Sequence, residues 1–182
     1  MIKYEDISIR LMKDCTEDYS AMAKWLSDPN VLDYYEDRNN PLDFDKVVAK
    51  FKPRVLKESN VIPCFIQHDN NDIGYIQYYE IPEKDKEGYG YQAEELIYGI
   101  DLFIGETNYW NKGIGTKILK ALLEYLKNEK CANRVIIDPQ TWNGRAVRCY
   151  EKCGFVKVKL LPTNELHDGE CKDNWLMEIR FK

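Results

Sequence analysis

Residues 110–116 are Trp110-Asn111-Lys112-Gly113-Ile114-Gly115-Thr116, and the fold of the surrounding chain can be worked out from this stretch. Its two glycines open the most regular helical pattern of the sequence, residues 115–130. Leucines and isoleucines recur there on one face, and Lys and Glu cover the other. Glycines at a helix entrance leave main-chain N–H groups bare, and such groups bind phosphate. The stretch therefore predicts a pyrophosphate site at the start of an amphipathic helix.

Two other phosphate-binding motifs do not fit this stretch. A Walker loop needs Gly-Lys followed by Ser or Thr, and Gly113-Ile114-Gly115-Thr116 lacks that order. A dinucleotide fingerprint needs a third glycine and a parallel strand-helix-strand start, and neither is present. On these residues alone, a glycine turn that binds no ligand remains an alternative.

A second informative stretch covers residues 143–155: Asn143-Gly144-Arg145-Ala146-Val147-Arg148-Cys149-Tyr150-Glu151-Lys152-Cys153-Gly154-Phe155. It predicts a helix over 143–152 that ends at Gly154. Asn143 is either an ordinary helix N-cap or a polar group beside a ligand. Tyr150 is either a packed aromatic or a proton donor.

The rest of the chain predicts one mixed α/β domain spanning residues 1–182. Alternating apolar residues indicate strands, helical spacing indicates helices, and no repeat or low-complexity linker divides the chain. A connection of about fifteen residues after residue 79 is longer than most and is typical of a binding loop. The expected strands are 7–11, 61–67, 73–79, 96–104, 134–138, 155–160 and 175–181, and the expected helices are 14–26, 43–56, 115–130 and 143–152.

Composition limits the classes of function. The 182 residues are 44% hydrophobic and 31% charged, with a net charge of −5, as in ordinary globular proteins. No run approaches the roughly 20 apolar residues of a membrane span, and the first residues lack a secretory core, so we expect a cytoplasmic protein that binds no membrane. Residues 80–106 carry eight acids against two bases, which disfavours nucleic acid as a partner. The six scattered cysteines predict reduced thiols and no metal site.

The glycine turn followed by the Asn143, Tyr150 and Gly154-Phe155 pattern resembles the GCN5-related N-acetyltransferase superfamily (GNAT). The resemblance implies a mostly antiparallel mixed sheet that is flanked by helices and splayed at an acetyl-CoA site. It makes Tyr150 the acid that protonates the departing thiolate. Trp110 stands where the family usually has Gln or Arg. The cofactor-binding residues implied are Lys112, Gly113, Ile114, Gly115 and Thr116 at the pyrophosphate, Phe103 and Ile104 at the pantetheine arm, and Asn143 beside that arm.

A closer resemblance rests on Ile97-Tyr98-Gly99-Ile100-Asp101-Leu102-Phe103-Ile104-Gly105-Glu106, on Asp138-Pro139 and on the tail from residue 160 to residue 180. These segments are similar to the aminoglycoside 6′-N-acetyltransferases, including the acetylating half of a bifunctional acetyltransferase–phosphotransferase. The resemblance implies acetyl-CoA as co-substrate, a polycationic aminoglycoside as acceptor, and no metal. Asp101 matches the family's essential Asp, and Asp138 an amine-binding Asp.

The residue types agree with a polyamine acceptor. Asp101 lies in an apolar strand, where a carboxylate needs a partner or a function. Six tyrosines lie between residues 75 and 98, although tyrosines in strands also fill sheet faces. The alternative role of Asp138 is to cap a helix or loop. The alternative role of Trp25 and Tyr35 is to pack in the core. The substrate-binding candidates are Trp25, Tyr35, Tyr79, Asp101, Asp138, Glu165 and Asp168, the last two in an expected late loop.

We expect direct transfer, without an acyl-cysteine intermediate, in a monomer or weak dimer. Asp101 orients the 6′-amine and takes its proton, main-chain amides of the same strand polarise the thioester carbonyl, and Tyr150 returns a proton to sulfur. One alternative is an N-acetyltransferase acting on a protein or peptide amine. The other is a coenzyme A-binding sensor without transfer activity.

Overall fold

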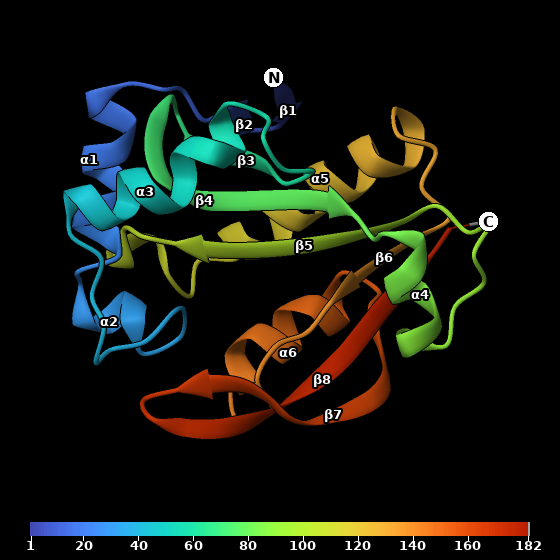
Figure 1. Cartoon of the computed structure of the whole chain (residues 1–182). Coiled ribbons are helices and arrows are strands. Elements are labelled where there is room, and N and C mark those ends of the chain that lie inside the picture. Colours follow the sequence, from blue (N-terminus) through green and yellow to red (C-terminus); the bar gives the residue numbers. More distant parts are fainter. Residues whose placement is uncertain (182) are drawn as a thin grey trace.

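The computed structural model describes residues 1–181 and contains an eight-stranded sheet in the order β1-β2-β3-β4-β5-β6-β8-β7, with helices on both faces (Figure 1). Neighbouring strands are antiparallel except for β5 and β6, which are parallel. This confirms the predicted mixed, mostly antiparallel sheet. The strands are β1 Ile2–Tyr4, β2 Ile7–Leu11, β3 Ile62–His68, β4 Asn71–Glu80, β5 Ile97–Ile104, β6 Arg134–Ile137, β7 Val156–His167 and β8 Glu170–Arg180.

Two layers of helices cover the sheet because strand side chains alternate between its faces. Phe65, Tyr75 and Phe103 belong to a core with α1 and α3, whereas Ile66 and Ile76 belong to a core with α5 and α6. The longest helix has 15 residues, and none of the helices within residues 1–181 is long and apolar enough to span a bilayer. The helices are α1 Thr16–Trp25, α2 Pro29–Leu32, α3 Phe44–Val55, α4 Glu83–Tyr89, α5 Ile114–Asn128 and α6 Gly144–Lys152.

The sheet opens between its two parallel strands. Pairing of β5 with β6 is limited to Ile97–Arg134, Tyr98–Val135 and Gly99–Ile136. Beyond these pairs β5 continues to Ile104, whereas β6 ends at Ile137. Residues 100–104 therefore keep β4 as a neighbour on one side and have no strand partner on the other. This is the splay that the family resemblance predicts.

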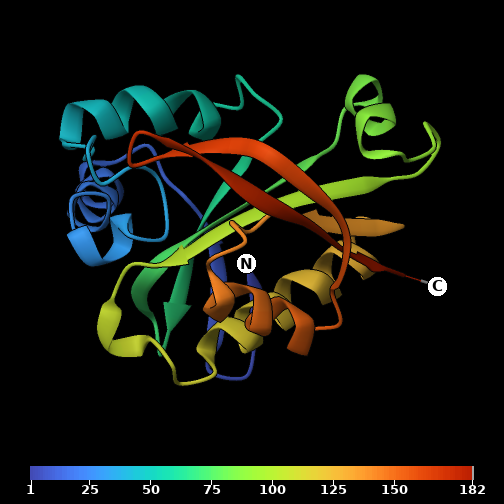
Figure 2. The same cartoon turned by 90° about the horizontal axis from the view of Figure 1, so that it is seen from below.

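Several regions differ from the sequence-based expectation, among them β1 and the short helix α2, which were not expected. The long connection after β4 contains α4, a short helix rich in Lys and Glu that has no apolar stripe to reveal it. The expected late loop is instead the far part of a hairpin formed by β7 and β8. Most of β7 is exposed, so its sequence lacks the alternation of a half-buried strand. In Figure 2 this hairpin crosses the molecule toward the side that carries α1 to α3.

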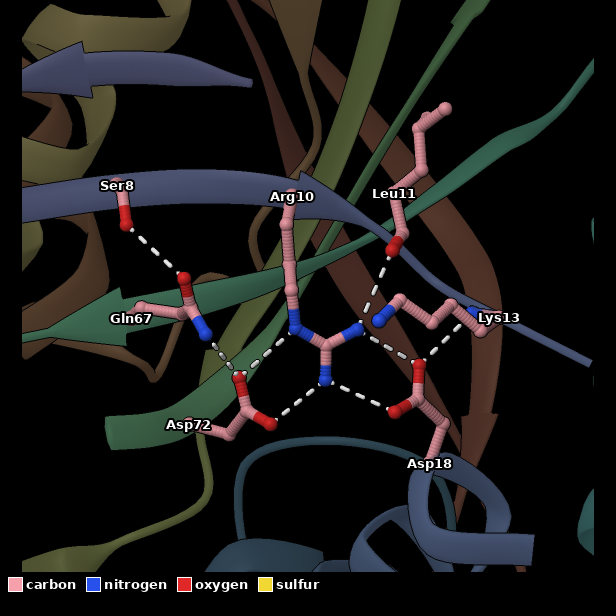
Figure 3. A network of polar contacts seen from close by, with 7 residues as sticks. All are labelled: Ser8, Arg10, Leu11, Lys13, Asp18, Gln67 and Asp72. Atoms are coloured by element: carbon pink, nitrogen blue, oxygen red, sulfur yellow. Dashed lines mark hydrogen bonds and ion pairs between the residues drawn. The ribbon is translucent and has the colours of Figure 1, made fainter. Parts of the chain in front are cut away.

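A buried ionic network fixes α1 to the sheet (Figure 3). Arg10 on β2 donates to Asp18 on α1 at 2.7 Å and to Asp72 on β4 at 2.6 Å. Gln67 donates to the same Asp72 at 2.9 Å, and the Arg10 guanidinium lies 4.5 Å from the ring centre of Phe65. The Arg10 and Asp18 side chains are largely buried. Their opposite charges are paired and hydrogen-bonded to each other, which offsets the cost of burying them.

Candidate active site

A cavity of about 690 Å³ occupies the opening between β5 and β6. One wall is the unpaired part of β5, residues 101–104, and the opposite wall is the segment after β6, residues 138–140. The start of α5 and the inward face of α6 close one end. The lining also includes residues 34–36, from the segment after α2, and Asn164 and Glu165 on β7.

The glycine turn lies at the α5 end of the cavity. Gly113 has a φ of +76°, and a Cβ at this position would have no heavy atom within 4 Å. α5 has no side-chain cap, and the main-chain N–H groups of 111–115 have no acceptor within residues 1–181. Gly115 lies close to α6, because a Cβ there would be 3.2 Å from Cys149 Sγ. The turn thus offers uncovered donors at the positive end of a helix dipole, which suits a diphosphate. Lys112 does not line the cavity.

Three cations on α6 face the same end of the cavity. Arg145, Arg148 and Lys152 line it, and none of them forms an ion pair within residues 1–181. Arg145 lies between two aromatic rings, 4.2 Å from the centre of Tyr34 and 4.1 Å from that of Trp110. The Trp110 indole in turn donates to the Ile104 carbonyl at 2.8 Å. Sequence analysis missed these cations, although their i, i+3, i+7 spacing places them on one helix face.

The opposite end of the cavity is acidic. Asp101, Asp138, Glu165 and Glu36 line it, the last paired with Lys50. Burial raises the pKa of Asp101 above its usual value. Burial, followed by repulsion from Asp101 and Glu165, raises the pKa of Asp138 to about 7. These carboxyl groups therefore lie close enough to oppose each other's ionisation, and a polycation would relieve that repulsion.

Asn143 and Tyr150 both line the cavity from α6. Asn143 is the N-cap of the helix, because its Oδ1 accepts from the main-chain N–H of Ala146 at 3.1 Å. Burial strongly raises the pKa of Tyr150, and the negative charges of Cys149 and Asp101 raise it further. The phenol therefore stays protonated. Its hydroxyl has no hydrogen-bond partner within the described residues and remains available to a ligand.

Tyr35 and Tyr79 lie beside Asp101. Tyr35 packs on Phe103 with ring centres 4.6 Å apart, and both tyrosines line the cavity. A Cβ on Gly99 would lie 2.6 Å from the Tyr79 ring, so Gly99 makes room for that ring.

Trp25 and Asp168, two of the predicted substrate-binding residues, lie outside the cavity. Trp25 is buried behind β5: its indole donates to Glu106 at 2.9 Å, and its ring fills the space where a Cβ on Gly105 would lie. This is the core-packing alternative considered from the sequence. Asp168, at the turn of the β7–β8 hairpin, accepts from the main-chain N–H of Arg38 at 3.1 Å. It therefore joins the hairpin to the segment after α2 instead of facing a ligand.

The cavity as a whole has two oppositely charged ends. Uncovered amides and three cations lie at one end, and four carboxyl groups lie at the other. No group of His, Cys, Asp or Glu side chains within residues 1–181 has an arrangement that would hold a metal ion. A ligand pair that fits this distribution consists of a polyanion and a polycation that meet at residues 101–104.

Residues 14–163 match the family model described as an acetyltransferase (GNAT) domain. The chain belongs to the GNAT acetyltransferase family. It is 28% identical over 159 residues to the aminoglycoside N(6′)-acetyltransferase type 1 of Klebsiella pneumoniae, which covers 87% of this chain and 78% of the relative.

Two solved GNAT structures are also similar to this GNAT chain. AAC(6′)-Ib in complex with ribostamycin and coenzyme A superimposes with a TM-score of 0.77 and 27% identity, over 96% of this chain and 93% of that one. The spermidine N-acetyltransferase of Vibrio cholerae, with coenzyme A and spermine, has a TM-score of 0.78 over 97% of this chain and 96% of that one. At 17% identity the second likeness concerns the fold alone.

In this GNAT chain most of the sequence-predicted site residues line one cavity, whereas Lys112, Trp25 and Asp168 do not. Asp101 and Tyr150 approach the same cavity from opposite sides of the opening, one from β5 and the other from α6. Phe103, Ile104, Gly113, Ile114, Gly115, Thr116 and Asn143 lie toward the cationic end or along the connecting wall, and Tyr35, Tyr79, Asp138 and Glu165 lie toward the acidic end. The cavity thus has a carboxyl group on one side and a protonated phenol on the other.

Proposed function

We propose that the protein transfers the acetyl group of acetyl-CoA to the 6′-amine of an aminoglycoside. The observation that carries the proposal is one cavity with a cationic end, suited to phosphates, and a carboxylate-lined end. The similarity of this chain to an aminoglycoside N(6′)-acetyltransferase, which extends over most of both chains, supports an aminoglycoside as the acceptor.

Binding follows the charge distribution. The bare amides after Trp110, together with the α6 cations, hold the phosphates of coenzyme A, and Phe103 and Ile104 lie along its pantetheine arm. Asp138 and Glu165 hold ammonium groups of the acceptor. The acceptor therefore approaches β5 from the side opposite to the coenzyme.

The chemistry needs one base and one acid. Acetyl-CoA supplies a thioester; the amine nitrogen forms a bond to its carbonyl carbon while the carbon–sulfur bond breaks. An amine with a pKa of about 10.4 loses a proton at pH 7 at a cost of about 4–5 kcal/mol. Asp101 orients this amine and takes its proton; burial raises the pKa of this carboxyl and so makes it a better base. Tyr150, held neutral by burial, gives its proton to the departing sulfur.

Direct transfer makes a cysteine intermediate unnecessary. Cys149 lines the cavity, and a hydrogen bond from Cys153 lowers the pKa of the Cys149 thiol to about 7. The other neighbour of Cys149 Sγ is Thr116 Oγ1, at 3.7 Å, and no histidine lines the cavity to act as its base. Cys149→Ser should therefore keep turnover within a few-fold of wild type; loss of all turnover, with folding retained, would establish an acyl-cysteine route.

The deciding assay measures the rate at which the protein acetylates different acceptor amines, with acetyl-CoA as the acetyl donor. Kanamycin and tobramycin should be acetylated, and NMR of the product should place the acetyl group on the 6′-nitrogen. Asp101→Asn should lower turnover by about a hundredfold, while Asp45→Asn, an exposed α3 acid, serves as the matched control. Faster acetylation of peptides would favour a protein N-acetyltransferase, and coenzyme binding without turnover of any amine would indicate a sensor.

We also propose that residues 1–182 act as one cytoplasmic domain, as a monomer or weak dimer, without nucleic acid. All eight strands within residues 1–181 belong to one sheet, and the net charge of −5 opposes binding to phosphate backbones. Light scattering across a range of protein concentrations measures the oligomeric state, and cell fractionation measures the location.

A further inference from the structure

Asp101 is linked to a cation on α3 through one glutamine. Asp101 and Gln77 lie directly opposite each other in the β4–β5 register. Gln77 Nε2 donates to Asp101 Oδ2 at 2.6 Å. The Gln77 oxygen accepts from Arg54 Nη1, on α3, at 2.7 Å. A chain of two hydrogen bonds therefore joins the guanidinium of Arg54 to the carboxyl group in the cavity.

The direction of the Gln77 amide is fixed by its other neighbours. Its Oε1 accepts from Arg54 and also from the Tyr75 hydroxyl, at 2.8 Å. Arg has donors only, and burial raises the pKa of Tyr75 so that its hydroxyl keeps the proton. A reversed amide would point its NH₂ group at the Arg54 donor, so the NH₂ group of the buried Gln77 must face Asp101.

Besides Gln77, the neighbours of Arg54 include the aromatic side chains Phe51 and Tyr75. It forms no ion pair within residues 1–181, and its guanidinium lies 4.9 Å from the ring centre of Phe51. The guanidinium donates to Gln77 Oε1. Arg54 is thus a half-buried positive charge without a carboxylate partner, linked to Asp101 through Gln77. Because burying an unpaired charge is costly, this arrangement indicates a role for Arg54 at Asp101.

We propose that Arg54 and Gln77 are positioning residues that hold the Asp101 carboxylate ionised and aimed at the acceptor amine. This inference rests on the proposed acetyl transfer. Arg54 and Gln77 act on Asp101 from the side of α3 and β4, and neither of them lines the cavity.

The charges that face Asp101 oppose each other. Glu165 on β7 and Asp138 after β6 disfavour its ionisation, as does burial, whereas Gln77, Arg54 and the Tyr79 hydroxyl favour it. The phenols of Tyr35, Tyr75, Tyr89 and Tyr150 also face it and stay neutral, because burial raises the pKa of each. Arg54 is thus the cation that balances two acidic neighbours. Without it, the equilibrium at Asp101 would shift toward the protonated carboxyl group, which cannot accept a proton from the amine.

The test follows the titration of Asp101 itself. In ¹³C-aspartate-labelled protein, the Asp101 carboxyl signal is assigned by its absence from Asp101→Asn. We expect Arg54→Met and Gln77→Met each to raise the measured pKa of Asp101 by about one unit. Arg54→Lys should restore most of the shift, and Lys52→Met, which removes an exposed cation from the same helix, should leave the pKa unchanged. An unchanged Asp101 titration in folded Arg54→Met protein overturns the proposal.

Kinetics provide a second readout. The acid limb of kcat/KM with kanamycin should move to higher pH in Arg54→Met by the same amount as the NMR titration, with an unchanged KM for acetyl-CoA. In the Gln77→Met background Arg54→Met should add little, because the linking amide is already gone; full additivity of the two effects would contradict the link. If Gln77→Met does not fold, Arg54→Met decides alone. Wild-type protein that acetylates no aminoglycoside would refute the proposed function while leaving the NMR test in force.

Discussion

Replacing Asp138 by Asn should stabilise the ligand-free protein, and the gain should increase with pH. In the folded chain burial, with Asp101 and Glu165 nearby, raises the pKa of Asp138 to about 7 from the usual 3.8. Asn164 Nδ2 donates to Asp138 Oδ2 at 3.1 Å, and the carbonyl oxygen of an Asn can accept the same bond. The substitution therefore removes a charge and keeps the local hydrogen bond.

The size of the gain follows from proton linkage. Between pH 4 and pH 7 the unfolded chain releases this proton and the folded protein retains it, so wild-type stability falls as the pH rises. Relative to a residue that never ionises, the cost to the folded state is about 1.7 kcal/mol at pH 5 and about 4 kcal/mol at pH 8, at about 1.4 kcal/mol per pKa unit. These figures are upper limits because solvent in the cavity screens part of the repulsion.

Urea denaturation at pH 5 and pH 8 measures this difference. Asp138→Asn should be stabilised at both values and more strongly at pH 8, whereas Glu124→Gln, an exposed acid on α5, should change little at either. Calorimetry should show weaker kanamycin binding by Asp138→Asn at pH 8, because an acceptor ammonium loses a carboxylate partner. An equal gain at both pH values, or none at pH 8, would refute the assignment of a raised pKa to Asp138.

Three further predictions concern other parts of the molecule. Tyr150→Phe should lower kcat by about 10- to 100-fold with unchanged affinity for acetyl-CoA, as steady-state kinetics and calorimetry can measure; a normal kcat would remove its role as acid. Gly99→Ala brings a Cβ to 2.6 Å from the Tyr79 ring, and should raise the KM for kanamycin several-fold while the KM for acetyl-CoA stays constant. Arg10→Met leaves the buried Asp18 without its partner and should lower the free energy of unfolding by about 3–5 kcal/mol in urea titrations, with kcat/KM near wild type at 25 °C.

The parts of the site that sequence could predict are those built from local chain geometry. The glycine turn and the helix after it follow from positive-φ chemistry and an apolar stripe, both readable over a few residues. Asp101 was identifiable because a carboxylate interrupts an apolar strand. Asp138 was identifiable through the resemblance and its place at the end of the next strand.

Features that depend on strand register or on packing between distant segments could not be predicted. The contact of Gln77 with Asp101 requires the β4–β5 register, and that of Arg54 requires the way α3 lies on the sheet. Trp25 belongs to the core because Gly105 leaves room for its ring, a relation across eighty residues of sequence. Glu165 was a candidate from the sequence, but the hairpin that brings it to the cavity was not predicted, because the exposed β7 lacks hydrophobic alternation.

That hairpin supplies its carboxylate separately from the strand that carries Asp101. The β7–β8 pairing shifts register between Leu161 and Glu165, and most side chains of β7 are free of the core. Substitutions there can reshape the pocket around an incoming sugar while β5 remains intact. Under selection by a new antibiotic, such an enzyme can change the range of drugs that it accepts through substitutions in the β7–β8 hairpin alone.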